Sequence, residues 1–372
     1  MPDSCRLTLE DGSVFDGIGF GRGGVTAGEV VFNTGMVGYP EALTDPSYRG
    51  QILVLTYPLI GNYGVPPRRL DSYNLPLGFE SEKIQVAGLV VSEHSASFSH
   101  HTAESSLDQW LAQQGVPAIY SVDTRALTKR LRQQGSMLGK IETDDEQTEF
   151  HNPNLTNLVS SVSPDDIGWL ETKGEGGKKD GPTVAVVDCG CKTAILRSLL
   201  GRGCSVMRVP YNYYFLNVKF DGLVISNGPG DPKMLESTIR NVRHALAVGR
   251  PILGICLGHQ LLARAIGAET YKMKFGHRSH NQPCVEIGGM SNSNNGGHHR
   301  CVITSQNHGF AVREEGLPED WRIWFRNAND GTVEGIRHVS KPFMGVQFHP
   351  EATPGPEDTG WIFDEFVRQV RD

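Results

Sequence analysis

A cysteine, a histidine and a glutamate in the second half of the chain have the residue types of a nucleophile, its base and the group that orients the base. Cys256 stands in the segment Gly-Ile-Cys-Leu-Gly, and His349 and Glu351 flank a proline farther along the chain. Neutral His349 would take the thiol proton and later return a proton to a leaving amine, while Glu351 would hold the ring tautomer. The set predicts acyl transfer through a covalent cysteine intermediate.

The residues around Cys256 predict a corner between a strand and a helix. Residues 251–255 form a short apolar run typical of a buried strand, and residues 257–266 carry apolar side chains at helical spacing. Gly254 and Gly258 leave room for a sharp, strained turn that exposes the nucleophile. The N-terminus of a helix also favours the charged form of a nearby thiol.

Acyl transfer also needs hydrogen-bond donors for the developing oxyanion. The segment 226–231, Ser-Asn-Gly-Pro-Gly-Asp, follows an expected strand at 222–225 and offers backbone N–H groups in a glycine-rich turn. We expect one donor from that turn and one from the N–H of Leu257, directly after the nucleophile. Taken alone, such a turn is more often only a tight connection.

Composition and charge exclude several classes of function. The chain has 372 residues and a net charge of -7, and its Lys and Arg residues are scattered, so we expect neither nucleic acid nor a membrane as partner. No apolar run is long enough to span a bilayer, and the N-terminus lacks the pattern of a signal or transit peptide. These features predict a cytoplasmic protein.

Cysteine and histidine usage predicts reduced thiols and no metal site. The seven cysteines lack paired spacing, which argues against a disulfide framework or a structural zinc site. Four histidines near glycine- and asparagine-rich sequence are interpreted as solvated loop residues: His277, His280, His298 and His299. Residues 288–299 are small, polar and repetitive, and are predicted to form a disordered surface loop.

The rhythm of the chain predicts two domains of the α/β class. Residues 1–150 begin with a predicted hairpin and contain β-branched runs and two predicted helices, at 103–114 and 124–134, which indicates a strand-rich α/β domain. Residues 151–182 are assigned to a linker. In 183–372 strands alternate with helices, which predicts a mainly parallel sheet flanked by helices, with Cys256 at the carboxyl end of a strand.

Four segments of the second half together resemble the class I, triad-type glutamine amidotransferases. They are 226–231, 254–260, Gln-Asn-His-Gly-Phe at 306–310, and His-Pro-Glu at 349–351. The first half is similar to the N-terminal domain of the carbamoyl phosphate synthetase small, glutamine-hydrolysing subunit, through its segments at 28–39, 43–48, 56–62 and 122–125. One departure is Ala194, where the family commonly has asparagine.

The resemblance implies a role for each matching residue. Cys256 would be acylated by the side-chain amide of L-glutamine, and His349 and Glu351 would complete the triad. The positions that match the family's glutamine contacts are Ser47, Gly228, Gly230, Leu257, Gln260, Asn307, Gly309 and Phe310. Ser47 belongs to the first domain, so the resemblance places glutamine where the two domains meet.

The resemblance also implies a partner. Ammonia would pass to a carbamoyl phosphate synthetase large subunit or fused synthetase domain, which would use ATP and Mg²⁺; no cofactor is expected in this chain. Two alternatives remain open at this stage. One is a non-catalytic regulatory module of a synthetase, and the other is the glutaminase component of a different amidotransferase. The sequence does not decide between pyrimidine and arginine synthesis, or between a separate subunit and part of a multifunctional protein.

Overall fold

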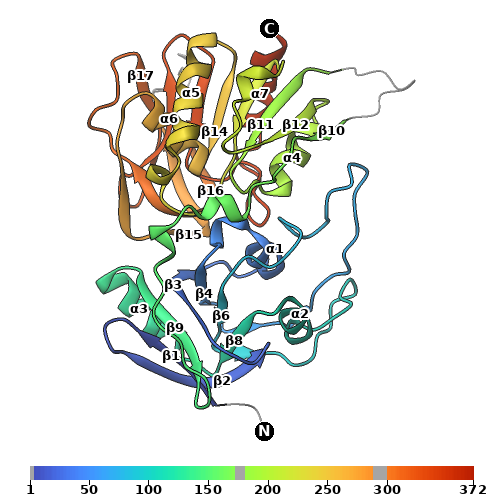
Figure 1. Ribbon diagram of the computed structural model, residues 1–372, viewed down its shortest axis with the longest axis vertical. Coiled ribbons are helices and arrows are strands. Elements are labelled where there is room, and N and C mark those ends of the chain that lie inside the picture. Colours follow the sequence, from blue (N-terminus) through green and yellow to red (C-terminus); the bar gives the residue numbers. More distant parts are fainter. Residues whose placement is uncertain (1–3, 172–180, 288–299) are drawn as a thin grey trace. The chain divides into compact units, whose positions relative to one another are not determined.

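The computed structural model describes residues 4–171, 181–287 and 300–372. The chain divides into two compact units (Figure 1). The first comprises Met1–Leu158 with Lys274–Arg278, and the second comprises Val159–Met273 with Ser279–Asp372. The predicted loop at 288–299 lies outside the described residues. Within the predicted linker, Val159 is buried and strand β10 joins the sheet of the second unit, so this part of the segment is built into that unit.

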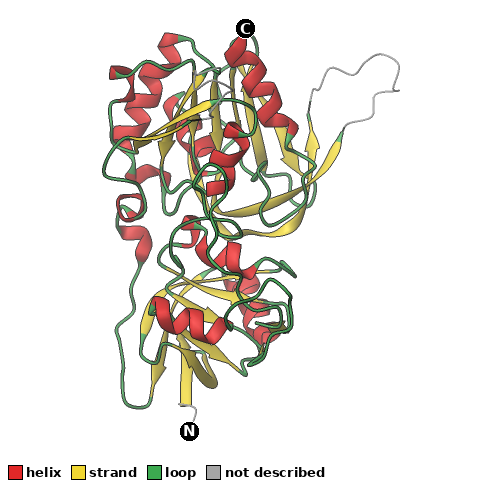
Figure 2. Ribbon diagram, turned by 90° about the vertical axis from the view of Figure 1, so that its right-hand side faces the viewer, coloured by secondary structure: helices red, strands yellow, loops and turns green. Residues whose placement is uncertain are grey.

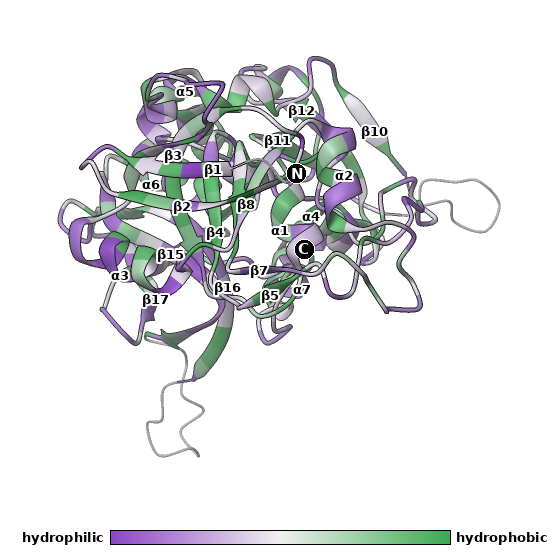
Figure 3. Ribbon diagram, turned by 90° about the horizontal axis from the view of Figure 1, so that it is seen from below, coloured by the Kyte–Doolittle hydropathy of each residue, from purple (hydrophilic) through white to green (hydrophobic). Residues whose placement is uncertain are grey.

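The first unit is built on seven strands that close into a barrel in the order β1-β2-β8-β6-β4-β3-β9. Hydrophobic residues run along barrel strands such as β4 and β8 (Figure 3). Neighbouring strands are antiparallel, except for the pairs β3–β4, β4–β6 and β6–β8, which are parallel. The strands are β1 Ser4–Leu9, β2 Val14–Gly21, β3 Thr26–Asn33, β4 Gln51–Leu55, β6 Gly88–Val90, β8 Pro117–Tyr120 and β9 Met137–Thr143; β5 Leu59–Ile60 and β7 Glu93–His94 form a separate pair.

Three helices accompany the barrel: α1 Tyr39–Thr44, α2 Leu107–Gln114 and α3 Thr124–Gln134. The predicted helix at 103–114 begins later than expected because Ser106 caps it, with its hydroxyl accepting a hydrogen bond from the N–H of Gln109. Asp123 caps α3 in the same way, as the sequence predicts. Leu107 and Leu111 of α2 are fully buried against the barrel.

The second unit contains a ten-stranded sheet in the order β10-β12-β11-β13-β14-β19-β18-β16-β15-β17. Strands β12, β11, β13, β14 and β19 are parallel, which confirms the predicted fold class. The strands that follow are antiparallel and were not anticipated individually. The bounds are β10 Gly168–Leu170, β11 Thr183–Asp188, β12 Ser205–Pro210, β13 Gly222–Ile225, β14 Ile252–Ile255, β15 Thr270–Glu286, β16 Cys301–Val312, β17 Trp321–Asn327, β18 Val333–His338 and β19 Phe343–Val346.

Four helices flank this sheet, and Figure 2 shows helices on both of its sides. They are α4 Thr193–Leu200, α5 Glu236–Val248, α6 Leu257–Ala265 and α7 Trp361–Arg371. Helix α5 packs on α6, and α4 packs on α7. The apolar face of α7 buries Ile362, Phe363 and Phe366 completely, since these side chains recur at helical spacing.

The parallel strands determine where polar side chains gather. Strands β11, β13, β14 and β19 run in the same direction, so the residues that follow them emerge at one edge of the sheet. Cys256 follows β14, and the segment that leads to His349 follows β19. Among the described residues, no helix combines the length and apolar character needed to cross a membrane.

Candidate active site

Cys256 occupies the predicted corner between β14 and α6. Its backbone has φ of 53° and ψ of -105°, a region that residues with a side chain rarely adopt. Its N–H donates to the carbonyl of Val346 at 2.8 Å, which fixes the corner to β19. A Cβ on Gly258 would lie 1.9 Å from the carbonyl oxygen of Ile225, and one on Gly254 would lie 2.6 Å from that of Gly258. Glycine is therefore required on both sides of the cysteine.

His349 and Glu351 follow β19 and contact each other directly. Nδ1 of His349 lies 2.6 Å from Oε1 of Glu351, and both side chains are buried. Strand β19 ends at Val346, and His349 and Glu351 stand in the turn region that follows it. The backbone N–H of His349 donates to the carbonyl of Ser305 at 2.9 Å, which anchors the turn on β16.

The free nitrogen of His349 is the one that faces the thiol. Its Nε2 is buried and has no geometric hydrogen-bond partner among the described residues. The Cys256 side chain nevertheless lies close enough to contribute to raising the pKa of His349. The thiol itself lies 3.6 Å from the carbonyl oxygen of Asn307. Cysteine, histidine and glutamate thus stand in the order that a triad requires.

A buried lysine that the sequence analysis did not select completes the cluster. Nζ of Lys192 lies 3.1 Å from Oε1 of Glu351 and donates to the carbonyl of Ala352 at 2.8 Å. Its backbone N–H donates to Oδ1 of Asn227 at 3.0 Å. Lys192 follows strand β11, whose carboxyl end lies at the same sheet edge as Cys256, but a single lysine after a strand has no distinctive pattern in the sequence.

Charge controls protonation in this cluster. Burial alone would raise the pKa of Glu351, but the ammonium of Lys192 and the imidazolium of His349 lower it to about 2. Burial alone would lower the pKa of His349, but the Glu351 carboxylate outweighs this effect and raises the pKa to about 10. Glu351 is therefore held ionised, and His349 is a ring that can hold a proton.

The predicted glycine-rich turn after β13 is tied to the loop that carries Lys192. Ser226 accepts a hydrogen bond from the N–H of Cys189 at 2.9 Å. A Cβ on Gly228 would lie 2.0 Å from the carbonyl oxygen of Cys189, and Gly230 has φ of 86°. Both glycines are required by the backbone path, and any contact of Gly228 or Gly230 with substrate comes from main-chain atoms.

The remaining predicted glutamine contacts of this unit lie on α6 and β16. Leu257 is the first residue of α6, and Asn307, Gly309 and Phe310 belong to β16. The side-chain nitrogen of Gln260 donates to the carbonyl of Phe310 at 2.9 Å and to Oε1 of Gln347 at 3.1 Å. The amide nitrogen of Gln260 therefore already fastens α6 to β16.

Comparison with known proteins identifies the family. The family model for class I glutamine amidotransferases matches residues 185–369, and the model for the CPSase domain of the carbamoyl-phosphate synthase small chain matches residues 7–141. The arginine-specific small chain of carbamoyl phosphate synthase from Neurospora crassa is 48% identical over 98% of this chain and 80% of its own length. This chain belongs to the carbamoyl phosphate synthase small-chain family.

Other relatives of this small-chain family are much longer. The multifunctional protein pyrABCN of Emericella nidulans is 49% identical over 99% of this chain but only 17% of its own length. The chain thus spans about one sixth of such multifunctional relatives. A solved structure of a glutamine amidotransferase from Thermotoga maritima aligns with 51% of this chain and 99% of its own, with 15% identity and a TM-score of 0.40.

Ser47, the predicted glutamine contact from the first half of this chain, belongs to the first unit. It lies in a short 3-10 helix, Pro46–Tyr48, is 8% exposed, and its backbone N–H donates to Oδ1 of Asp45 at 2.9 Å. Its contact with glutamine stays a prediction.

Two of the histidines interpreted as solvated loop residues lie in strand β15. His277 is buried, which corrects that interpretation, because the strand continues through the glycine-containing segment. His280 is half-buried, and burial together with the nearby Lys192 charge lowers its pKa to about 4. His298 and His299 lie outside the described residues.

Proposed function

We propose that the chain hydrolyses L-glutamine through a cysteinyl thioester. The Cys256 thiolate attacks the side-chain amide carbon, and His349, which has taken the thiol proton, gives a proton to the departing nitrogen so that ammonia leaves. The γ-glutamyl thioester is then attacked by water, with His349 as the base that accepts its proton. Glutamate is released and the thiol is restored.

One observation carries this proposal: Lys192 contacts Glu351, Glu351 contacts His349, and the Cys256 side chain lies close enough to His349 to raise its pKa, with all four residues buried. A purely structural ion pair would not need a strained cysteine facing the free ring nitrogen. Glu351 fixes the ring through Nδ1, which leaves Nε2 for the thiol and for the leaving group. Lys192 holds Glu351 in place and ionised.

The proposed binding residues of the second unit lie at the start of α6, in the turn after β13 and on β16. The N–H of Leu257 stands at the start of α6 and is suited to hold the oxyanion, with a second donor from the turn that contains Gly228 and Gly230. Asn307, Gly309 and Phe310 of β16 are the proposed contacts with the substrate, and Gln260 holds that strand through its hydrogen bond to the Phe310 carbonyl. Ser47 is proposed as a further contact.

The proposed partner is a carbamoyl phosphate synthetase large subunit or fused synthetase domain. Ammonia that escapes into water is protonated and lost as a nucleophile, so hydrolysis is useful only when coupled to its consumption. We propose that ATP and Mg²⁺ are bound by the synthetase and that this chain works without a cofactor; the cytoplasmic location stays a prediction. Low glutaminase turnover of the chain alone, raised by adding the synthetase, is the expected result. Full turnover without the partner would contradict the coupling.

Substitution Cys256→Ala tests the catalytic claim. We expect glutamine-dependent ammonia release to fall by about 10⁴-fold or more, and the acid-stable label from radioactive glutamine to disappear, because no thioester forms. Cys301→Ala is the matched control, since that cysteine is exposed and lies outside the cluster. Unchanged ammonia release by Cys256→Ala would contradict the role of Cys256 as the nucleophile.

A further inference from the structure

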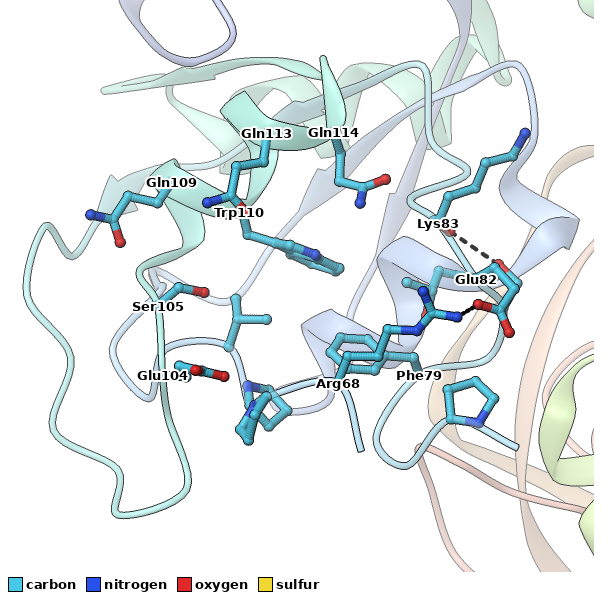
Figure 4. Close-up of a pocket in the computed structure, with 16 residues that line it drawn as sticks. Arg68, Phe79, Glu82, Lys83, Glu104, Ser105, Gln109, Trp110, Gln113 and Gln114 are labelled. Carbon is cyan, nitrogen blue, oxygen red and sulfur yellow. Dashed lines mark hydrogen bonds and ion pairs between the residues drawn. The ribbon is translucent and has the colours of Figure 1, made fainter. Parts of the chain in front are cut away.

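A cavity in the first unit shares no residue with the proposed glutaminase site. It has a volume of 580 Å³ and is bordered by the loop around 65–68, the segment 76–83, residues 104–105 and helix α2 (Figure 4). This volume is within the range of pockets that hold small organic groups. Nothing in the proposed reaction makes use of it.

Two aromatic rings form its apolar wall. Trp110 comes from α2 and Phe79 from the segment that precedes β6, and their ring centroids lie 5.6 Å apart with the planes at 45°. The capping box formed by Ser106 and Gln109 fixes the start of α2, so the turn that carries Trp110 is held in place. Figure 4 shows the indole ring extending into the cavity. An indole is the side chain that attracts cations most strongly through its π face.

Among the charged groups around the cavity, the acidic side chain of Glu104 has no ion-pair partner among the described residues. Arg68 is paired with Glu82, so these two charges compensate each other. Lys83 extends away from the cavity in Figure 4. The backbone N–H of Glu104 donates to the Val65 carbonyl at 2.9 Å, next to the bridge between Val65 and Ser105. The cavity therefore presents an available carboxylate across from an aromatic wall.

We propose that this cavity binds a guanidinium group carried on an aliphatic stem. The planar cation stacks on Trp110, and its N–H groups reach the Glu104 carboxylate in a forked arrangement. The amide oxygens of Gln113 and Gln114, at the end of α2, accept the remaining N–H donors. The stem packs against Phe79 and the prolines of the loop, Pro66 and Pro67. An anionic ligand is disfavoured because the basic Arg68 is already neutralised.

The guanidinium can be free or can belong to an arginine side chain of a protein partner. Both sources share the same chemistry. The proposal does not depend on the glutaminase assignment, because no residue is common to the two sites, and Glu104→Gln is expected to leave glutaminase turnover unchanged.

An NMR titration of the full chain with butylguanidinium tests the proposal, with butylurea as the neutral molecule of the same shape. We expect butylguanidinium to bind at least about tenfold more tightly than butylurea, and Glu104→Gln to weaken its binding by about tenfold. Trp110→Leu removes the stacking surface and serves as a second variant. The matched control is Glu93→Gln, an exposed glutamate of the same unit that does not border the cavity.

Equal binding of butylguanidinium and butylurea, or equal loss in Glu104→Gln and Glu93→Gln, would overturn the proposal. A blocked pentapeptide with a central arginine, compared with its citrulline counterpart, distinguishes the sources. Binding of both butylguanidinium and the arginine peptide supports a side chain from a protein partner. Binding of butylguanidinium alone supports a free small cation, because the cavity then rejects a peptide backbone.

Discussion

Two buried histidines of the second unit have opposite properties. His259, three residues after Cys256 on α6, is completely buried, and neither ring nitrogen has a geometric hydrogen-bond partner among the described residues. Burial lowers its pKa to about 3. His349 is buried as deeply, but Glu351 raises its pKa. Burial alone therefore keeps a histidine neutral, and the adjacent carboxylate is what allows one to hold a proton during a reaction.

The largest expected difference in kcat comes from substituting each of the two histidines separately. We expect His349→Asn to lower the kcat of the glutaminase by about 10⁴-fold or more, because the base and the proton donor are both removed. His259→Leu fills a similar volume without polar atoms, so we expect kcat to stay within about tenfold of the parent chain. Steady-state ammonia release measures both variants, with circular dichroism as the check that each is folded. Equal losses in the two variants would show that the comparison is wrong.

The second-largest expected effect concerns the Glu351 carboxylate, which lies beside His349 and distinguishes it from His259. Glu351→Gln removes the charge that orients His349, and we expect kcat to fall by about 10²- to 10⁴-fold. It also leaves the Lys192 ammonium buried without its counter-charge, at a cost of about 3–5 kcal/mol in the free energy of unfolding.

The double variant Glu351→Gln with Lys192→Met separates these two consequences. Removing the stranded ammonium is expected to restore part of the stability measured by urea unfolding, but none of the activity. Recovery of turnover in the double variant would contradict the role of Glu351 as the group that orients the base.

Much of the proposed catalytic site was accessible from the sequence because its signals are local. Gly254 and Gly258 predict the corner at Cys256, and His349 and Glu351 are separated by a single proline, so their contact follows from short-range geometry. The alternating strands and helices likewise predict the parallel sheet.

What escaped prediction depends on contacts between distant segments. Lys192 reaches Glu351 only because β11 and β19 belong to the same sheet, and a lone lysine after a strand has no distinctive pattern. The closure of the first unit into a barrel depends on the pairing of β1 with β9, which are separated by most of that unit. His277 was misassigned because glycines nearby suggested a loop, whereas pairing in the long strand β15 outweighs local propensity.

The smallest expected effect is a difference in how pH changes stability at the two histidines. His259 has its pKa lowered from 6.5 to about 3, so the unfolded chain takes up a proton that the folded chain refuses. Its contribution to stability is complete above 6.5 and is lost as pH falls below that value, by about 1.4 kcal/mol per pH unit. His349 has its pKa raised from 6.5, so its contribution is complete below 6.5 and is lost as pH rises.

Urea unfolding from about pH 4 to about pH 9 gives the free energy of unfolding of the parent chain and of each variant. The slope of their difference against pH measures the contribution of each histidine. As pH falls, the free energy of unfolding of the parent chain should decrease relative to that of His259→Leu. As pH rises, the free energy of unfolding of the parent chain should decrease relative to that of His349→Asn. The signs must be opposite because one ring excludes a proton in the folded state and the other retains it. Two slopes of the same sign would mean that Glu351 does not hold the proton on His349, and the physical distinction between a buried neutral histidine and a buried base would fail.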